Sequence, residues 1–126
     1  MIFGIGTDIV RVARMQQDID RFGDRFAERI LSAGELQDYR QNANKPGFLA
    51  RRFAAKEAAA KALGTGFSQG VLIRDIEVTH DPQGKPILSF SGRAKQFMQE
   101  KGIVVSHISL ADEQDHAVAF VTLETV

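Results

Sequence analysis

Residues 51–66 are RRFAAKEAAAKALGTG, the part of the chain that most strongly determines its architecture. The longer stretch 48–63 contains no glycine or proline and is rich in alanine, the residue with the highest helix propensity. Gly64 follows as a helix stop, so we predict a long helix over 48–63. Its many small side chains allow neighbouring elements to pack closely, and we therefore expect this helix to be central.

Upstream of this helix, residues 2–10 are apolar and include Gly4 and Gly6, which predicts a buried strand. Residues 11–29 have helical periodicity that is interrupted at Gly23, which predicts two short helices. A further helix is expected to begin at Ser32, because Glu35 follows it at the spacing of a capping box.

The second half of the chain is richer in strand-forming residues. The expected elements, in order, are a strand at 71–80, a turn at DPQGKP, a strand at 87–91, an amphipathic helix at 93–101 closed by Gly102, and strands at 103–111 and 117–125 joined by DEQDH. The three prolines, Pro46, Pro82 and Pro86, are expected in loops. Helices gather early and strands late, so we predict one α+β domain over 1–126, with a mainly antiparallel sheet packed on the central helix.

Composition excludes several classes of protein. The chain has 126 residues, a mass of 13.9 kDa, no cysteine and equal numbers of basic and acidic residues. Without cysteine there is no disulfide framework, thiolate zinc site or thiol nucleophile. Zero net charge argues against a general electrostatic grip on nucleic acid. No targeting segment or membrane span is apparent, so the cytoplasm is the expected location.

Asp8 is the first candidate for chemistry, because this carboxylate lies in an apolar stretch, GTDIV. Burying a carboxylate is costly unless it meets a cation or hydrogen-bond donors. An equally good interpretation is an ordinary aspartate at a strand end, capped by Thr7 or by the main chain.

Glu57 and Lys61 share one face of the predicted central helix with Phe53, at spacings of four residues. In isolation, Glu57 and Lys61 would be interpreted as a local ion pair worth a few tenths of a kcal/mol. A glutamate on a central helix, however, needs a partner beyond one flexible lysine. The loop Gly64-Thr65-Gly66 can present main-chain N–H groups to an anion, although a glycine after a helix is more often only its cap.

Four arginines form the only clustered positive feature, and apolar side chains line the neighbouring sector of the predicted helices. The arginines are Arg11, Arg14, Arg21 and Arg25, and the apolar neighbours include Met15 and Phe22. Arginine binds carboxylates in a bidentate manner, so an acidic protein partner is a fair inference, and a solvated face is the alternative. His107 lies in an apolar strand, where a hydrogen-bonded core role is commoner than a ligand role; His80 and His116 are expected in solvent.

Four stretches follow one another along the chain: GIGTDIVRVARM, RRFAAKEAAAKALGTG, DPQGKP and SHISLADEQDHAVAFV. Their order and spacing resemble those of the holo-[acyl-carrier-protein] synthases, the short class of 4′-phosphopantetheinyl transferases. His116 departs from the resemblance, which leads us to expect an aromatic residue such as tyrosine there.

The resemblance implies transfer of 4′-phosphopantetheine from coenzyme A to a serine of apo acyl carrier protein, in fatty acid biosynthesis. It implies that Asp8 and Glu57 bind Mg²⁺, which prefers one or two carboxylates together with substrate phosphates. Lys61 would stabilise the leaving phosphate, and either Glu57 or a water on the metal would act as the base.

The remaining implied contacts fall into two groups. The coenzyme A contacts are Lys61, Gly64, Thr65, Gly66, Gly84, Lys85, Pro86 and His107. The carrier-protein contacts are Arg11, Arg14, Met15, Arg21, Phe22 and Arg25. The resemblance also implies a homotrimer with coenzyme A at subunit interfaces, and no nucleic acid or membrane partner.

Two other interpretations of the sequence stay open. A non-catalytic α+β module could use the arginine face to bind protein or RNA, although the single tyrosine and zero net charge argue against RNA. Another Mg²⁺-dependent phosphotransferase is the second alternative, without a P-loop because no GxxxxGK[ST] motif occurs.

Overall fold

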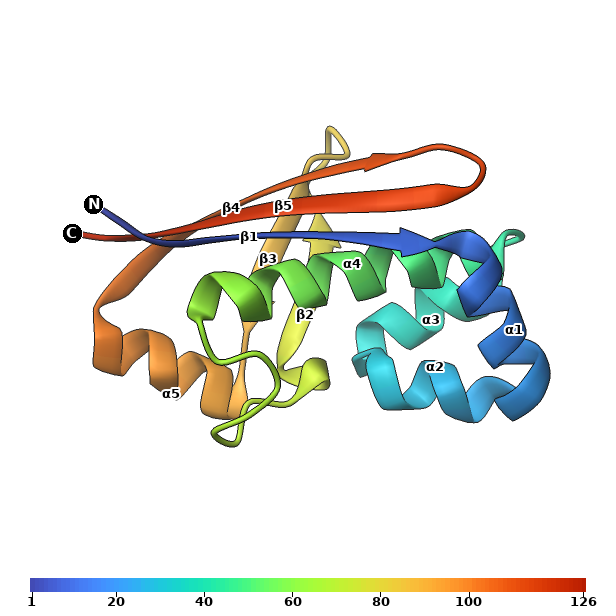
Figure 1. The fold of residues 1–126 in the computed structure, drawn as a ribbon, viewed down its shortest axis with the longest axis horizontal. Coiled ribbons are helices and arrows are strands. Elements are labelled where there is room, and N and C mark those ends of the chain that lie inside the picture. The colour runs from blue at the N-terminus through green and yellow to red at the C-terminus, as the bar shows by residue number, and fades with distance from the viewer.

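The helix α4 (Lys45–Leu63) runs through the middle of the structure, a computed structural model that describes all residues 1–126 (Figure 1). It begins three residues earlier than predicted, because the side chain of Asn44 accepts a hydrogen bond from the N–H of Gly47. Pro46 therefore lies in the first helical turn and not in a loop, at a position where its missing N–H costs nothing. At the other end, Gly64 adopts the left-handed conformation of a helix cap.

A three-stranded antiparallel sheet covers one side of α4 (Figure 1). Its order is β1 (Ile2–Arg11), β5 (His116–Thr125) and β4 (Ile103–Asp112). The face toward α4 is buried, with Ala117, Ala119, Val121 and Leu123 of β5 all at most 1% exposed. The opposite face has no covering element, so the prediction that residues 2–10 form a strand is confirmed but the expectation that it is buried is wrong for one face.

Two glycines bring β1 against the backbone of α4. A Cβ atom at Gly6 would lie 1.9 Å from the carbonyl oxygen of Ala58, and one at Gly4 would lie 2.1 Å from that of Ala62. No side chain fits at either position. Because alternate residues of a strand share a face, Asp8 points toward α4 as Gly4 and Gly6 do.

Three short helices pack at the amino-terminal end of α4 (Figure 1). They are α1 (Val12–Phe22), α2 (Asp24–Ile30) and α3 (Ala33–Gln41). The predicted break at Gly23 is confirmed, since this glycine has φ +63° between α1 and α2. The predicted capping box is confirmed as well: Ser32 Oγ accepts from the Glu35 N–H, and Glu35 Oε1 accepts from the Ser32 N–H.

A second sheet consists of β2 (Ile76–His80) and β3 (Pro86–Phe90), joined by the predicted turn. Pro86 begins β3, paired with His80, so its expected place in a loop is wrong. The strand predicted over 71–80 is wrong for its first five residues. A carboxylate oxygen of Asp75 accepts from the N–H of Leu72, which closes a turn, and Ile73–Asp75 form the 3-10 helix η1. Beyond β3, the predicted helix is α5 (Gly92–Lys101), and Gly102 caps it.

The predicted α+β class, with a mainly antiparallel sheet on a long central helix, is confirmed. A cluster of 27 buried apolar residues joins α4 to both sheets and to α5. None of the helices combines the length and the apolar character that crossing a bilayer requires.

Candidate functional site

Asp8 and Lys61 form an ion pair between β1 and α4. Lys61 Nζ lies 3.0 Å from Asp8 Oδ1 and donates a second hydrogen bond, of 2.9 Å, to the main-chain oxygen of Thr7. The Asp8 side chain is only 17% exposed, whereas that of Lys61 is 52% exposed. The local pair between Glu57 and Lys61 does not form, because Lys61 reaches across to the strand.

Glu57 lies beside this ion pair and has a raised pKa. Burial is the main cause, and the negative charge of Asp8 is the second; Lys61 and Arg14 act in the opposite direction. Because the charge of Asp8 acts on Glu57, the two carboxylates share one partly buried site. Such a site favours a cation that interacts with both.

The donor set fits Mg²⁺ held jointly with a substrate. No group of three or more His, Cys, Asp or Glu side chains is arranged to hold a metal by itself. Two carboxylates alone suit Mg²⁺, which usually completes its octahedron with water and with phosphate oxygens. Asp8 and Glu57, predicted as metal ligands, are therefore brought together by the fold.

The loop after α4 is mainly a helix cap. The N–H groups of Gly64 and Gly66 both donate to the carbonyl oxygen of Ala60, so they are not available to phosphate oxygens. Thr65 is 7% exposed and its hydroxyl donates to the Gly66 oxygen. The expectation that this loop presents its main-chain N–H groups to an anion is therefore wrong for Gly64 and Gly66. Of the three residues, only Thr65 has an N–H that donates no hydrogen bond within the chain.

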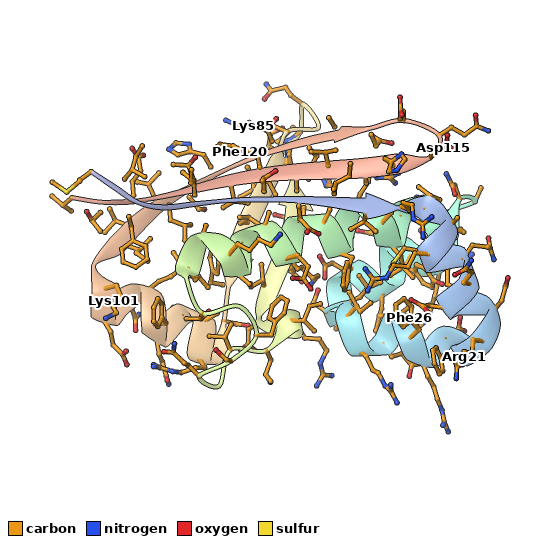
Figure 2. The ribbon with its side chains drawn as sticks, viewed as in Figure 1. Arg21, Phe26, Lys85, Lys101, Asp115 and Phe120 are labelled. Atoms are coloured by element: carbon orange, nitrogen blue, oxygen red, sulfur yellow. The ribbon has the colours of Figure 1, made fainter.

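Lys85, Pro86 and His107 lie together, although they come from different strands. They line a pocket of about 240 Å³ between the β2–β3 hairpin and β4, together with Ile87, Leu88, Ser106 and Ile108. Gly84 lies at the adjacent turn, with φ +87°. Figure 2 shows Lys85 projecting beyond the sheet at the tip of this hairpin.

His107 is exposed and not a core residue, which corrects one interpretation of the sequence. Its Nε2 lies 2.8 Å from a carboxylate oxygen of Glu124, and its side chain is 59% exposed. His80 is exposed as expected, whereas His116 is half-buried at the start of β5.

The strand register places Asp8 and His107 on opposite faces of the sheet. Asp8 pairs with Ala119, which faces α4, whereas His107 pairs with Thr122 and lies in register with Ile5 on the uncovered face. Within one chain, the carboxylate pair and the His107 pocket therefore lie on opposite sides of the sheet and do not face the same ligand.

The four predicted arginines are exposed but do not form one helical stripe. Arg11 ends β1, Arg14 and Arg21 lie on α1, and Arg25 lies on α2. The guanidinium of Arg14 stacks 5.3 Å from the centre of the Phe53 ring, and that of Arg21 lies 5.1 Å from that of Phe22. Figure 2 shows Arg21 at the outer edge of α1.

Met15 is wrong as a partner contact. Met15 is the buried residue of α1 and points into the core, so its side chain is not available to another protein. Phe22, in contrast, is 45% exposed and stacks on Phe26 at the break between α1 and α2, where an apolar contact is possible.

Sequence reasoning missed a buried charged cluster on the far side of α4. Glu35 and Lys56 are 1% and 0% exposed, and Arg52 is 6% exposed beside them. Burial lowers the pKa of Lys56, against the opposing effect of Glu35. The only indication in the sequence is a lysine within an alanine-rich helix, which is ordinarily interpreted as a solvated residue.

Comparison with known proteins gives one consistent family. The family model described as the 4′-phosphopantetheinyl transferase superfamily matches residues 4–121. Among curated proteins, the chain is 54% identical over 125 residues to "Holo-[acyl-carrier-protein] synthase" of Halorhodospira halophila, which covers 99% of both chains.

Solved structures agree with this family. A holo-[acyl-carrier-protein] synthase from Neisseria meningitidis superposes with a TM-score of 0.94 at 43% identity, covering 99% of this chain and 100% of that one. A holo-(acyl-carrier-protein) synthase from Bacillus anthracis, in complex with CoA (3′,5′-ADP), gives a TM-score of 0.83 at 38% identity, covering 100% and 99%.

Proposed function

This chain belongs to the 4′-phosphopantetheinyl transferase superfamily, and we propose that it transfers 4′-phosphopantetheine from coenzyme A to a serine hydroxyl of apo acyl carrier protein. The products are holo acyl carrier protein and adenosine 3′,5′-bisphosphate. The observation that carries the proposal is the junction of β1 and α4, where Asp8, Glu57 and Lys61 converge. Two carboxylates and an exposed ammonium suit the pyrophosphate of the coenzyme.

In the proposed site, Asp8 and Glu57 hold Mg²⁺. When bound, the ion neutralises charge on the pyrophosphate oxygens. Lys61 is fixed by Asp8 and Thr7 and still half exposed, so it can reach the leaving phosphate. Glu57, whose pKa is raised by burial, is suited to accept the serine proton. The serine oxygen bonds to the phosphorus next to pantetheine, and the bond from that phosphorus to the departing nucleotide breaks.

We assign the rest of coenzyme A to the pocket of Lys85, Pro86 and His107, with Gly84 at its edge. Gly64, Thr65 and Gly66 lie one turn beyond Lys61 and are assigned to the phosphates by close approach of the backbone, with one free N–H at Thr65. The exposed groups Arg11, Arg14, Arg21, Arg25 and Phe22 are assigned to the carrier protein.

We also propose a homotrimer in which each coenzyme site is shared by two subunits. The uncovered face of the sheet supports it: Ile5 is 60%, Ile9 is 64% and Phe120 is 46% exposed there, and such an apolar surface favours a protein contact. The opposite orientations of Asp8 and His107 support it too, because residues of two subunits can then meet one coenzyme.

The setting that we propose is fatty acid biosynthesis in the cytoplasm, with residues 1–126 acting as one domain. We base this setting on the proposed acceptor, an apo acyl carrier protein.

The test of the transfer is a change of mass. Purified chain is incubated with apo acyl carrier protein, coenzyme A and Mg²⁺, and the carrier is weighed by mass spectrometry. We expect the carrier to gain one phosphopantetheine group, and chelation of the metal with EDTA to prevent the gain. No gain with any of several apo carrier proteins would favour a binding module instead.

A further inference from the structure

Glu35 and Lys56 form an ion pair in which every charged atom has partners. Glu35 Oε1 accepts from Lys56 Nζ at 2.7 Å and from the Ser32 N–H at 2.9 Å, and Oε2 accepts from the Val78 N–H at 2.9 Å. Lys56 Nζ also donates to the main-chain oxygen of Ile76, and lies 3.4 Å from that of Ile73.

These contacts attach the β2–β3 hairpin to the remainder of the molecule. No hydrogen bond joins the hairpin to the α-helices or to the three-stranded sheet except those from Glu35, Lys56 and the Ser32 hydroxyl, which donates to Glu77. The apolar contacts of the hairpin, through Ile76 and Val78, are not directional. The ion pair therefore supplies the specific orientation of β2 on α4.

Stability alone does not account for this arrangement. A buried ion pair pays a desolvation penalty, and well-packed apolar side chains of similar volume are often as stabilising. Glu35 and Lys56 bond to the main chain of β2, and hydrogen bonds depend on direction, so the pair favours one position of the strand on α4.

The hairpin held in this way leads to the coenzyme pocket and not to the carboxylate pair. β2 continues into the turn that carries Gly84 and Lys85, and Pro86 begins β3. Asp8 is positioned by a different set of contacts, the close approach of β1 to Ala58 of α4. Loss of the ion pair should thus affect the coenzyme pocket and leave the carboxylates in place.

We propose that Glu35 and Lys56 are positioning residues that hold the β2–β3 hairpin at the angle needed to bind the nucleotide portion of coenzyme A. The inference rests on the proposed function for the identity of the ligand. It assigns to this pair a role in coenzyme affinity, exerted at a distance through β2 and β3.

The test uses the triple variant Glu35→Gln/Arg52→Met/Lys56→Met. Arg52 is buried and its Nε lies 3.8 Å from Glu35 Oε2, so any smaller change would leave one buried charge unpaired and endanger folding. Steady-state transfer is measured well below the melting temperature of the variant. We expect the KM for coenzyme A to rise about tenfold, with kcat and the KM for carrier protein within about twofold of wild type. An unchanged KM for coenzyme A, or a loss confined to kcat, would overturn the proposal.

Hydrogen exchange provides a readout that does not depend on activity. In the triple variant, amides of residues 76–90 should exchange about tenfold faster, while those of β1 and β5 keep their protection. Unchanged exchange in the hairpin would overturn the positioning role even if the chain proved to have another substrate. The matched control is Arg93→Met/Glu100→Gln, which removes an exposed 2.7 Å ion pair on α5 and should change neither the KM nor the exchange of the hairpin.

Discussion

Among single residues, Glu57 links stability to chemistry most clearly. Its pKa is raised first by burial and then by the charge of Asp8, so the folded state disfavours the ionised carboxylate. Below its ordinary pKa of 4.5, Glu57 is protonated in both the folded and unfolded states and has no effect of this kind. As the pH rises through the higher folded pKa, the folded protein loses stability relative to the unfolded chain.

The substitution Glu57→Gln should therefore stabilise the chain at neutral pH when Mg²⁺ is absent. The variant should melt at a higher temperature than wild type near pH 7 in EDTA, and the difference should vanish toward about pH 4. Thermal melts across this range check the prediction. A variant that melts below wild type at neutral pH would contradict the inferred crowding of the two carboxylates.

Among the elements, the contact between β1 and α4 depends on the absence of side chains. In Gly6→Ala the new methyl group would meet the oxygen of Ala58 at 1.9 Å and the nitrogen of Ala62 at 2.8 Å, and both atoms belong to the backbone. Forcing the two elements apart should cost about 1–3 kcal/mol or more and lower the Tm by several degrees. Turnover should fall with it, because Asp8 moves with the strand.

Thr7→Ala is the matched control for this substitution on the other face of β1. It removes one hydrogen bond of 3.0 Å to the oxygen of Ala119, which should cost about 1 kcal/mol. If Gly6→Ala melts like wild type, β1 does not require glycine for its approach to α4.

Two exposed arginines of helix α1, Arg14 and Arg21, are expected to contact the carrier protein. Arg14→Glu and Arg21→Glu should raise the KM for the acidic carrier protein, and added salt should reduce the effect because exposed charges are screened over about 8–10 Å. Arg21→Glu is the cleaner variant, since the charge of Arg14 also acts on Glu57. Its KM for coenzyme A should stay unchanged.

Arg40→Glu, an exposed arginine on α3, is the control for a general effect of charge. An Arg21→Glu variant whose carrier KM equals that of Arg40→Glu at low salt would identify the arginines as a solvated face.

Local patterns predicted the elements well and their tertiary partners poorly. The break at Gly23, the capping box of Ser32 and the cap at Gly64 depend on neighbouring residues, so the sequence contains them. Lys61 pairs with a residue 53 positions away instead of with Glu57, and no local spacing contains that choice. The buried position of Lys56 was missed for the same reason.

Two predictions were wrong because the same sequence pattern occurs in two kinds of structure. The apolar run of β1 suggested burial on both faces, but Ile5 and Ile9 lie on the uncovered face of the sheet. The β-branched residues after Val71 suggested strand, whereas the bond from Leu72 to Asp75 closes a turn. The fold does bring Asp8 close to Glu57, as the resemblance implied and periodicity did not, and their binding of Mg²⁺ stays a prediction.

For the whole molecule, the shared coenzyme site can be tested by mixing subunits. Asp8→Asn and His107→Ala should each be nearly inactive at limiting coenzyme A, because each lacks one half of every site. When the two variants are co-expressed in equal amounts and assemble at random, about one interface in four over all trimers combines an intact Asp8 half with an intact His107 half. We expect activity to return in the mixture, and sedimentation to show an assembly of three 13.9 kDa chains. Mixed trimers without activity, or a fully active monomer, would refute the shared site.

We propose that the Asp8–Glu57 pair supports Mg²⁺-dependent transfer of phosphopantetheine. A single-turnover measurement isolates this role, with enzyme in excess over apo acyl carrier protein and with coenzyme A and Mg²⁺ saturating. Wild type should release one adenosine 3′,5′-bisphosphate for each holo carrier formed. Asp8→Asn and Glu57→Gln, shown to be folded by their melting curves, should be slower by a factor of about 10² or more. Transfer by either variant at the wild-type rate would show that the carboxylate pair is not needed for the reaction.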